Sequence, residues 1–387
     1  MQRRIRPAEI LPDDADATLI GRVWLDEASG PCPVVIDRTR VRDISALGPT
    51  VSHILNLEHR FPENRARFPI IGELDDFLSQ NGNTGARGSL LAPNDLQVVK
   101  AAGVTFVDSM LERVIEERAK GNPTLADAIR GELKQALGDQ LSSVVPGSEA
   151  AIKVKAILQS SGHWSQYLEV GIGPDAEIFT KASPMSSVGC GAMIGINPIS
   201  SWNNPEPEVV LAVNARGEIK GATLGNDVNL RDIEGRSALL LSKAKDNNGA
   251  CAVGPFIRLF DDRYTLAAVE AMSVQLHVSG TDGFVLDGTN DMSRISRSLT
   301  DLVRQTINSC HQYPDGFMLF LGTMFAPVQD RAEQGLGFTH QLNDEVRISS
   351  SSLGTLLNWV GTSDQISPWS FGIGDLMSNL AKRGLLR

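Results

Sequence analysis

The sequence predicts an α+β protein with a small N-terminal β-rich domain and a larger C-terminal domain. Three observations support this class. Short aliphatic runs such as TLIGRVWL and PCPVVI alternate with polar turns before residue 78. Helical periodicity marks the next part of the chain, and short β runs separated by turn signals fill the part after residue 165. The predicted order is therefore a β-rich beginning, a helical middle and a long β-rich remainder.

Length and composition limit the class of protein. The 387 residues exceed one ordinary domain, and the 42% apolar and 21% charged residues are typical of globular proteins. A formal net charge of −10 without a dense Lys/Arg cluster argues against nucleic acid as a partner. The four cysteines form no CxxC pair, which argues against a zinc knuckle or a disulfide framework. We expect reduced, mostly buried thiols.

Neither export nor membrane insertion is predicted. The beginning MQRRIRPAEILPDD lacks the apolar core of a secretory signal. The longest apolar run, near residues 316–327, is too short for the roughly 20 residues that a membrane helix needs. We therefore expect a cytoplasmic protein that does not contact a membrane.

The stretch SQNGNTGARGS at residues 79–89 is the predicted domain boundary, because glycine and asparagine concentrate there. It divides the chain into domains at 1–89 and 90–387. The stretch lacks a Gly-Lys-Ser/Thr ending, so it does not predict a phosphate-binding P-loop.

Three helices are predicted after this boundary. The first is an amphipathic helix over residues 107–120. Its polar face carries Glu112, Arg113, Glu116 and Glu117. The second begins at Asn122 in NPTLADAIRGELKQALG, and the third covers SEAAIKVKAILQSS. Further along, EVVLAV, SVQLHVSG and DEVRISS predict strands, with Asp282-Gly283 and Asp287-Gly288 as turns between strands.

The segment WNNPEPEVVLAV places two acids directly before a strand. Side chains alternate along an extended chain, so Glu206 and Glu208 are expected on one side and Pro205 and Pro207 on the other. Proline donates no backbone hydrogen bond, which suits an edge strand or a strand entrance. Two carboxylates this close repel each other unless a cation compensates them.

A third acid, Asp227, follows Gly225 and Asn226, and we expect a tight turn that returns it toward the glutamates. Three oxygen ligands suit Mg²⁺ or Mn²⁺. Each acid also has an ordinary interpretation, because Glu-x-Glu on a strand is commonly a solvated face and Asp in a Gly-Asn-Asp sequence commonly forms a turn.

The segment SKAKDNNGACAVGPF carries two lysines, Lys243 and Lys245. A lysine beside a metal ion and apolar walls has a lowered pKa and acts as a base. Spacing alone does not choose between the two lysines, and both also fit exposed surface charges. Arg231 and Asp232 also fit a structural salt bridge.

Four motifs in order, PEPEVVLAVN, LGNDVNLRDIEG, KAKDNNGACAVGP and LGTMFAP, resemble the fumarylacetoacetate hydrolase superfamily over roughly residues 90–387. The resemblance implies a mixed β-roll catalytic domain with peripheral helices and a helical lid region at about 104–160. It also implies that Glu206, Glu208 and Asp227 hold Mg²⁺, or alternatively Mn²⁺. The superfamily's active-site lysine precedes a Gly-Pro pair by nine residues, which selects Lys245 because Gly254-Pro255 closes this segment.

One departure bears on the reaction. Hydrolases and decarboxylases of the superfamily carry a His-Glu lid dyad in a pattern like G-x-N-Y-x-D-H, whereas this chain reads AAGVTFVDSMLERV, with Ser109 where the histidine would fall. The missing histidine argues against carbon–carbon bond hydrolysis.

The segments AAGVTFVDSMLERVIEERA, WSQYLEVGIGPDAEIFTKASPMSS and HQYPDGFMLFLGTMFAP are similar to the 2-keto-3-deoxy-pentonate dehydratases of the superfamily. These enzymes convert 2-keto-3-deoxy-D-xylonate, the same compound as 2-keto-3-deoxy-D-arabinonate, to α-ketoglutarate semialdehyde in non-phosphorylative pentose catabolism. The resemblance implies a Mg²⁺-dependent hydro-lyase whose partner is a small 2-keto-3-deoxy sugar acid.

The same resemblance implies residue roles. Lys245 is expected to remove a proton beside the keto group, and Glu177 in GPDAEIFTK to protonate the departing hydroxyl. The candidates to donate hydrogen bonds to the substrate carboxylate are Thr323, Ser186 and Ser187. Arg231 and Asp232 are expected behind the metal ligands.

The sequence leaves two alternatives open. The first is an acylpyruvate-type diketo-acid hydrolase or a 2-oxoacid decarboxylase that uses the same metal site. The second is a non-catalytic binding or assembly protein that keeps the β-roll, against which the complete Glu, Glu, Asp and Lys set argues. The resemblance further implies a homodimer or a homotetramer.

Overall fold

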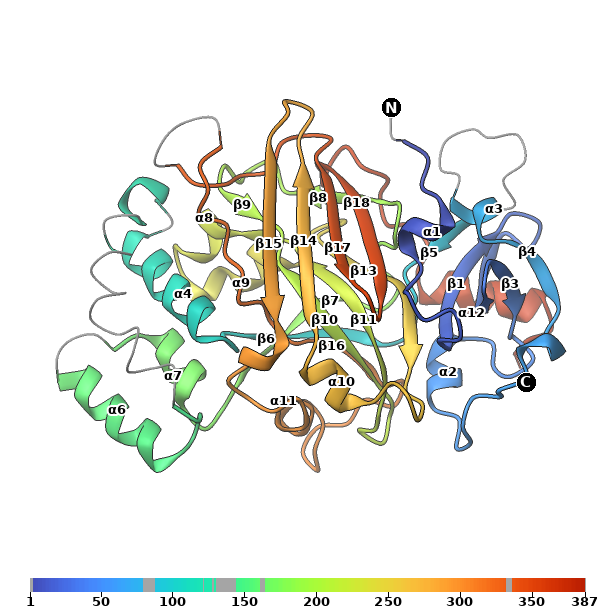
Figure 1. Ribbon diagram of the computed structural model, residues 1–387, viewed down its shortest axis with the longest axis horizontal. Coiled ribbons are helices and arrows are strands. Elements are labelled where there is room, and N and C mark those ends of the chain that lie inside the picture. The colour runs from blue at the N-terminus through green and yellow to red at the C-terminus, as the bar shows by residue number, and fades with distance from the viewer. Residues whose placement is uncertain are drawn as a thin grey trace.

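The computed structural model of the chain describes residues 3–78, 88–120, 122–126, 129, 144–160, 164–331 and 336–386. Two β-sheets lie face to face at the centre of the molecule (Figure 1). Three helices, α4 (Val107–Ala119), α6 (Glu149–Ser160) and α7 (Gln166–Ile172), lie at one end, and the N-terminal strands form the other end. The predicted α+β class is confirmed.

The larger sheet has the strand order β4-β3-β2-β1-β13-β11-β10-β16-β6-β7, and β5 pairs with β1. It is mixed, because β16 and β6 run parallel whereas the other neighbours run antiparallel. Its strands within the described residues are β1 (Leu19–Leu25), β2 (Gly30–Asp37), β3 (Arg40–Asp43), β4 (Ile70–Glu73), β5 (Gly88–Leu91), β6 (Val98–Gly103), β7 (Glu177–Ala182), β10 (Pro207–Val213), β11 (Ile219–Asp227), β13 (Cys251–Leu259) and β16 (Phe317–Phe320).

The second sheet has the order β15-β14-β17-β18-β8, and a short pair, β9 and β12, lies apart from both. The bounds of these strands are β8 (Met193–Ile196), β9 (Asn203–Asn204), β12 (Asn229–Leu230), β14 (Ser273–Ser279), β15 (Val285–Asp291), β17 (Glu345–Ser350) and β18 (Gly354–Thr362). The remaining helices are α1 (Pro7–Ile10), α2 (Val51–Leu55), α3 (Asp75–Leu78), α8 (Arg231–Glu234), α9 (Leu241–Lys245), α10 (Leu266–Glu270), α11 (Leu299–Thr306) and α12 (Ile373–Lys382), with 3₁₀ turns at η1 (Arg65–Arg67), η2 (Ala238–Leu240) and η3 (Met292–Arg294).

Strand β10 is buried on both faces. Val209 and Leu211 belong to the core between the two sheets, whereas Val210 and Ala212 belong to a second core that includes residues of α2. Every residue of β10 is buried. Two-sided burial explains why this strand is an unbroken aliphatic run rather than an alternating one.

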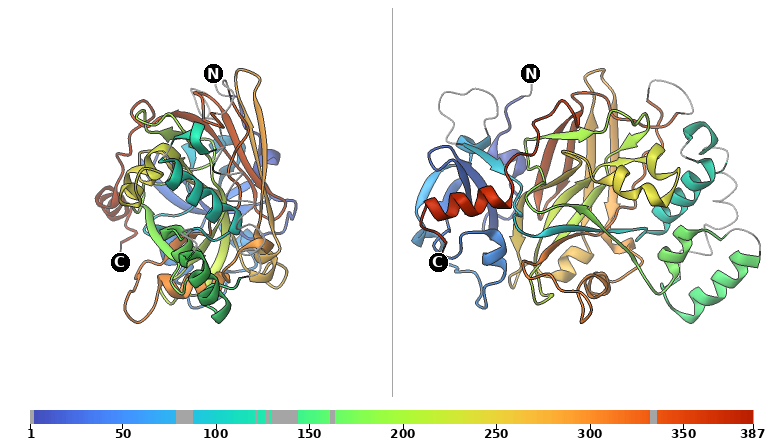
Figure 2. Two further views of the ribbon diagram at one scale, coloured as in Figure 1. Left: turned by 90° about the vertical axis from the view of Figure 1, so that its left-hand side faces the viewer. Right: turned by 180° about the vertical axis from the view of Figure 1, so that it is seen from behind.

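The N-terminal strands continue the central sheet, because β1 pairs with β13 through Leu19↔Arg258 and Ile20↔Ile257. The C-terminal helix α12 packs on this part of the molecule (Figure 2). Asn379 Nδ2 donates to the carbonyl oxygen of Ala28 (2.8 Å). Of the predicted boundary at 79–89, residues 79–87 lie outside the described residues, and the domain division stays a prediction.

The predicted helices at 107–120 and in SEAAIKVKAILQSS are confirmed as α4 and α6. The helix predicted from Asn122 lies largely outside the described residues. The turn predicted at Asp282-Gly283 is confirmed, since Gly283 has a positive φ of 83° between β14 and β15. The turn predicted at Asp287-Gly288 is wrong. Because the chain has already reversed at Gly283, these residues lie within β15 and pair with β14.

All four cysteines are free, and three of them are buried, as predicted, whereas Cys310 is exposed. None of the helices in the described part of the chain has the length and apolar character needed to cross a membrane.

The two-sided burial of β10 predicts a large stability loss for Leu211→Ala. Removing a fully buried leucine side chain costs about 2–5 kcal/mol of unfolding free energy. Leu239→Ala is the matched control, because Leu239 is 95% exposed. Thermal unfolding followed by circular dichroism measures both, and equal midpoints for the two variants would contradict the described core.

Candidate active site

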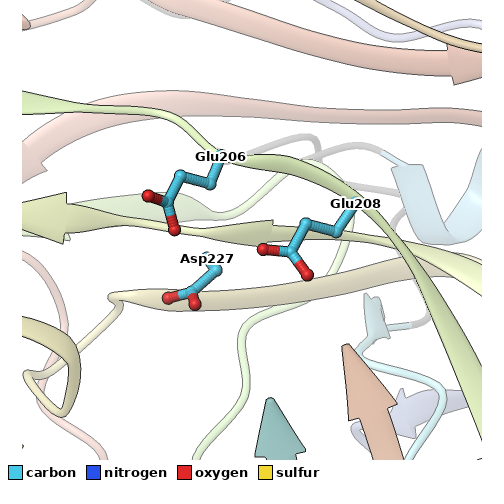
Figure 3. Close-up of side chains that lie close together, drawn as sticks. All are labelled: Glu206, Glu208 and Asp227. Carbon is cyan, nitrogen blue, oxygen red and sulfur yellow. The ribbon is translucent and has the colours of Figure 1, made fainter. Parts of the chain in front are cut away.

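Three carboxylates converge where β10 begins and β11 ends (Figure 3). Glu206 and Glu208 flank Pro207, and Asp227 is the last residue of β11. The register opposes Glu208 to Gly225, and the N–H of Asp227 donates to the carbonyl oxygen of Glu206 (3.1 Å). One carboxylate oxygen from each acid lies within 4.8 Å of the others, and all three residues are buried. The acids therefore share one region of space, as the alternation predicted.

One expectation about these acids is wrong, and one alternative interpretation is excluded. Asp227 does not lie in a tight turn, because β11 runs through it and brings it to the glutamates by strand register. The glutamates are not a solvated face, since Glu206 is 5% and Glu208 2% exposed. Pro207 lies at the entrance of a central strand, one of the two positions that proline was expected to occupy.

A buried asparagine connects the acid pair to the LGTMFAP loop. Asn290 Nδ2 donates to the carbonyl oxygens of Pro207 (2.9 Å) and Gly322 (3.2 Å), and its Oδ1 accepts from the N–H of Met324 (3.1 Å). The N–H of Gly322 in turn donates to Glu208 Oε2 (2.6 Å). These bonds explain how a motif more than 100 residues away in sequence belongs to the same site.

Three cationic side chains reach the acids. Lys245, at the end of α9, places Nζ 2.5 Å from Glu206 Oε2 and 3.1 Å from Asp227 Oδ2. Lys181 of β7 places Nζ 2.7 Å from Asp227 Oδ1, and Arg113 of α4 places a guanidinium nitrogen 2.6 Å from Glu206 Oε1. Lys243, by contrast, is exposed. The structure therefore brings Lys245 to the acids, in agreement with the residue that the resemblance selected.

The polar face of α4 faces this site. Arg113 pairs with Glu116 (2.7 Å) and with Glu234 of α8 (2.9 Å), and Arg231 pairs with Glu116 (2.7 Å). Glu116 is only 2% exposed. An amphipathic pattern usually directs its charges to solvent, but here opposite charges from α8 meet them inside the protein.

Sequence reasoning missed Arg113, Glu116, Lys181 and Glu234. For Lys181 a signal was available, because alternation along β7 puts it on the same face as Glu177. For the three others no local signal exists, since their partners come from distant segments.

A cavity lies between α4, β7 and the acid triad. It is lined by the triad, by Lys245, Arg113, Glu116, Arg231 and Glu234, and by Ser109, Glu177, Phe179 and Thr323. Ser109 Oγ donates to the carbonyl oxygen of Phe106 (2.9 Å). The Ser109 hydroxyl, at the position where the resemblance would place a histidine, is thus engaged by the backbone at the start of its own helix.

The candidates for substrate binding separate into two groups. Thr323 lines the cavity, and its Oγ1 accepts from the N–H of Phe325 (3.1 Å). Ser186 and Ser187 are not among the residues that line the cavity. Ser186 Oγ donates to the carbonyl oxygen of Ser183 (2.7 Å), which makes it a loop-supporting hydroxyl. The geometry supports Thr323 and not the two serines.

The alternative pairing of Arg231 with Asp232 is absent from the ion pairs of the described residues. Arg231 pairs with Glu116 and with Glu112 (3.2 Å), whereas Asp232 accepts from Ser200 Oγ (2.7 Å) outside the cavity lining. Arg231 also donates to the carbonyl oxygen of Pro327 (3.0 Å). It therefore links α4 to the loop that follows Thr323, and it does so without touching the acid triad.

Burial and neighbouring charges shift the pKa values of the acids. Burial, together with Asp227 and Glu206, raises the pKa of Glu208 well above its ordinary value. Burial raises the pKa of Glu177 as well, although Arg113 and Lys245 oppose the rise.

The carboxylate neighbours of Lys245 raise its pKa, whereas the predicted lowering concerns a lysine beside a bound metal ion and stays a prediction. Burial alone would lower it, but Asp227, Glu206 and Glu234 together outweigh burial. Direct contact with carboxylates favours the charged ammonium form, and a bound cation would act in the opposite direction.

The donor set fits a hard divalent cation. Carboxylate oxygens are the ligands that Mg²⁺ and Mn²⁺ prefer. Among the ion pairs of the described residues, Glu206 and Asp227 have lysine partners and Glu208 has none. A cation held by all three acids would supply the positive charge that Glu208 lacks.

Two curated dehydratases are similar to this chain in sequence. A curated 2-dehydro-3-deoxy-D-arabinonate dehydratase from Saccharolobus solfataricus is 31% identical over 183 residues, which is 47% of this chain and 57% of that protein. A probable 2-keto-3-deoxyxylonate dehydratase from Haloferax volcanii is 29% identical over 72% of this chain and 91% of that protein. The chain thus spans a little over half of the first relative and nearly all of the second. No protein-family model matches the sequence.

Solved structures show the fold. A 2-keto-3-deoxy-D-arabinonate dehydratase complexed with magnesium and 2,5-dioxopentanoate is 21% identical, with a TM-score of 0.59 over 89% of this chain and 99% of that chain. A fumarylacetoacetate hydrolase from Exiguobacterium antarcticum is 15% identical, with a TM-score of 0.54 over 89% of this chain and 100% of that chain. The resemblance predicted from the sequence is confirmed, and the chain has the fumarylacetoacetate hydrolase fold.

Glu208→Gln is expected to weaken divalent-cation binding by at least about tenfold, because it removes one charged ligand from the set. Titration calorimetry with Mg²⁺ measures the affinity. Asp232→Asn is the matched control, since Asp232 lies near the site without lining the cavity. Undiminished Mg²⁺ affinity in Glu208→Gln would contradict a metal site at the triad.

The pH dependence of stability is expected to report Glu234. Burial raises its pKa to about 7, although Arg113 and Lys245 oppose the rise. The folded state keeps the Glu234 proton up to about pH 7, whereas the unfolded state releases it near the ordinary pKa of glutamate. The protonated carboxyl therefore adds to the free energy of unfolding at low pH, and this stabilisation is lost as pH rises through about 7. Glu234→Gln should therefore gain thermal stability relative to the wild type between about pH 5 and pH 8.

The control for this measurement is Glu218→Gln. The pKa of Glu218 is lowered to about 2 by hydrogen bonds from Arg216 and Asn214, so its titration lies below the window. If the unfolding midpoints of the wild type and of Glu234→Gln changed in parallel with pH, the raised pKa of Glu234 would be contradicted.

Proposed function

We propose that the protein is a metal-dependent dehydratase that converts 2-keto-3-deoxy-D-xylonate, equivalently D-arabinonate, to α-ketoglutarate semialdehyde. The observation that carries the proposal is the convergence of the triad Glu206, Glu208 and Asp227 with the amine of Lys245 in one cavity. The names of the curated relatives and of the magnesium-bound neighbour support the same reaction.

Glu206, Glu208 and Asp227 would hold Mg²⁺, with Mn²⁺ as an alternative. When bound there, the ion stabilises negative charge on the 2-oxo oxygen and so makes the neighbouring methylene acidic. The substrate class follows from this chemistry, because a 2-oxo acid offers two oxygens to one hard cation.

Lys245 is the proposed base for the methylene proton. Its amine must be neutral to accept this proton. Glu206 and Asp227 stabilise its ammonium form in the described structure, and a cation shared by these carboxylates would counter that stabilisation. Binding of a cation by these carboxylates would therefore favour the neutral amine of Lys245 that proton removal needs.

Glu177 is the proposed acid for the departing β-hydroxyl. Its raised pKa, caused first by burial, favours the protonated carboxyl that the role needs. Transfer of this proton to the hydroxyl releases water as the C3–C4 double bond forms. Loss of a C5 proton and return of a proton to C3 then move the double bond to C4–C5, and the resulting C5 enol tautomerises to the aldehyde. The hydroxyl of Thr323 in the cavity is suited to the substrate carboxylate.

The hydrolase and decarboxylase alternative has weaker support. It requires a group that activates water, and Ser109 replaces the lid histidine while donating its hydroxyl hydrogen to Phe106. The non-catalytic alternative leaves the buried acids and lysine without a use.

The proposal includes a cellular setting. Four free cysteines support a reducing compartment such as the cytoplasm. From the resemblance we also propose that the protein forms a homodimer or a homotetramer. Its proposed place is in non-phosphorylative pentose catabolism.

The purified protein with Mg²⁺ is expected to form α-ketoglutarate semialdehyde from 2-keto-3-deoxy-pentonate, detected by mass spectrometry. Lys245→Met and Glu177→Gln should each lower kcat by about 100-fold or more, because each removes a proton-transfer group. Lys243→Met is the matched control, since Lys243 is a neighbouring exposed lysine. Cleavage of acylpyruvates without any semialdehyde would reject the dehydratase.

A further inference from the structure

Lys181 is a buried cation that the proposed chemistry does not use. It lies on β7 and is 0% exposed. Alternation along β7 places it on the same face as Glu177 and Phe179, both of which line the cavity, whereas Lys181 does not line it. A buried lysine is costly unless its ammonium group is paired and fully hydrogen-bonded.

The ammonium group of Lys181 has three oxygen neighbours, one in an ion pair and two in hydrogen bonds. Nζ lies 2.7 Å from Asp227 Oδ1 and donates to the carbonyl oxygens of Val228 (3.1 Å) and Lys245 (2.5 Å). The first partner is a proposed metal ligand, and the third is the backbone of the proposed base. One side chain thus connects β7, the end of β11 and the end of α9.

These contacts constrain the Asp227 carboxylate. Lys181 holds Oδ1, and Lys245 Nζ lies 3.1 Å from Oδ2, so each oxygen faces a different lysine. The same ammonium group fixes the backbone from which the Lys245 side chain extends. Movement of Lys181 would therefore change the orientation of the ligand and the position of the base together.

We propose that Lys181 is a positioning residue that holds Asp227 and the backbone of Lys245 in the relative arrangement that metal binding and proton removal require. Lys181 acts through these two residues and does not contact the substrate. This inference deepens the proposed function and depends on it for the part that concerns turnover.

Lys181→Met tests the inference, because methionine keeps similar length and removes the charge and all three donors. The expected result is a Mn²⁺ affinity lowered by about 10- to 100-fold, as for other groups that orient metal ligands. Electron paramagnetic resonance of Mn²⁺ added to the protein measures this without any turnover. With saturating Mg²⁺ and 2-keto-3-deoxy-pentonate, kcat should fall about tenfold or more while KM changes less.

The matched control is Lys100→Met. Lys100 lies on the adjacent strand β6, where its Nζ donates to Thr180 Oγ1 (2.9 Å) in an exposed hydrogen bond outside the cavity lining. Wild-type Mn²⁺ affinity and turnover are expected for this variant. A loss equal to that of Lys181→Met would overturn the inference, since any lysine removed from this sheet would then have the same effect.

A double-mutant cycle separates positioning from general destabilisation. If Lys181 acts on the metal through Asp227, Lys181→Met should weaken Mn²⁺ binding much less in an Asp227→Asn background than in the wild type. Additive losses would overturn the inference. If Lys181→Met does not fold, Lys181→Gln is measured in the same way, and wild-type Mn²⁺ affinity in that variant would also overturn it.

Failure of the proposed function gives a different pattern. A wild type that binds Mn²⁺ but does not dehydrate the sugar acid would reject the reaction, and the Mn²⁺ affinities would still decide the role of Lys181. A wild type that binds no Mn²⁺ would overturn both.

Discussion

The need to neutralise a buried group of carboxylates governs the candidate site. Seven acidic side chains line one cavity, and like charges this close are strongly unfavourable in a poorly hydrated interior. Two features of the structure reduce this repulsion. Arg113, Arg231, Lys181 and Lys245 supply positive charge, and burial raises the pKa values of Glu177, Glu208 and Glu234, which favours their protonated forms. Segments far apart in sequence, from α4 to α9, meet at the cavity, and together they supply both the carboxylates and the cations that offset them.

Much of the fold could be predicted from local patterns. Periodicity found α4 and α6, and aliphatic runs found β10, β14 and β17, because these signals depend on neighbours in sequence. The strand order was not predictable in the same way. The pairing of β1 with β13, for example, joins residues that are more than 200 positions apart and leaves no local trace. Asp287-Gly288 has turn composition yet extends β15, because tertiary pairing outweighs a local preference.

The site was predictable where chemistry is concentrated in short motifs. The shared orientation of Glu206 and Glu208 follows from strand alternation, and the structure confirms it. Asp227 was expected at the right place for the wrong reason, since register rather than a turn brings it there. The direction of the Lys245 pKa could not be predicted, because it depends on which carboxylates contact the ammonium group. Arg113 was missed because charged residues on an amphipathic helix are ordinarily solvated.

The junction of β1 with β13 joins the N-terminal segment to the central sheet. Gly30 approaches Asn379 of α12 so closely that a Cβ atom at position 30 would lie 2.3 Å from the Asn379 side chain. The N-terminal strands and the C-terminal helix are therefore in close contact. Excising the first 89 residues would therefore do more than remove an appendage. It would strip β13 of a hydrogen-bonding neighbour and uncover the apolar side of α12, leaving a sheet margin prone to self-association. We therefore expect the N-terminal segment to shield this margin of the central sheet from self-association.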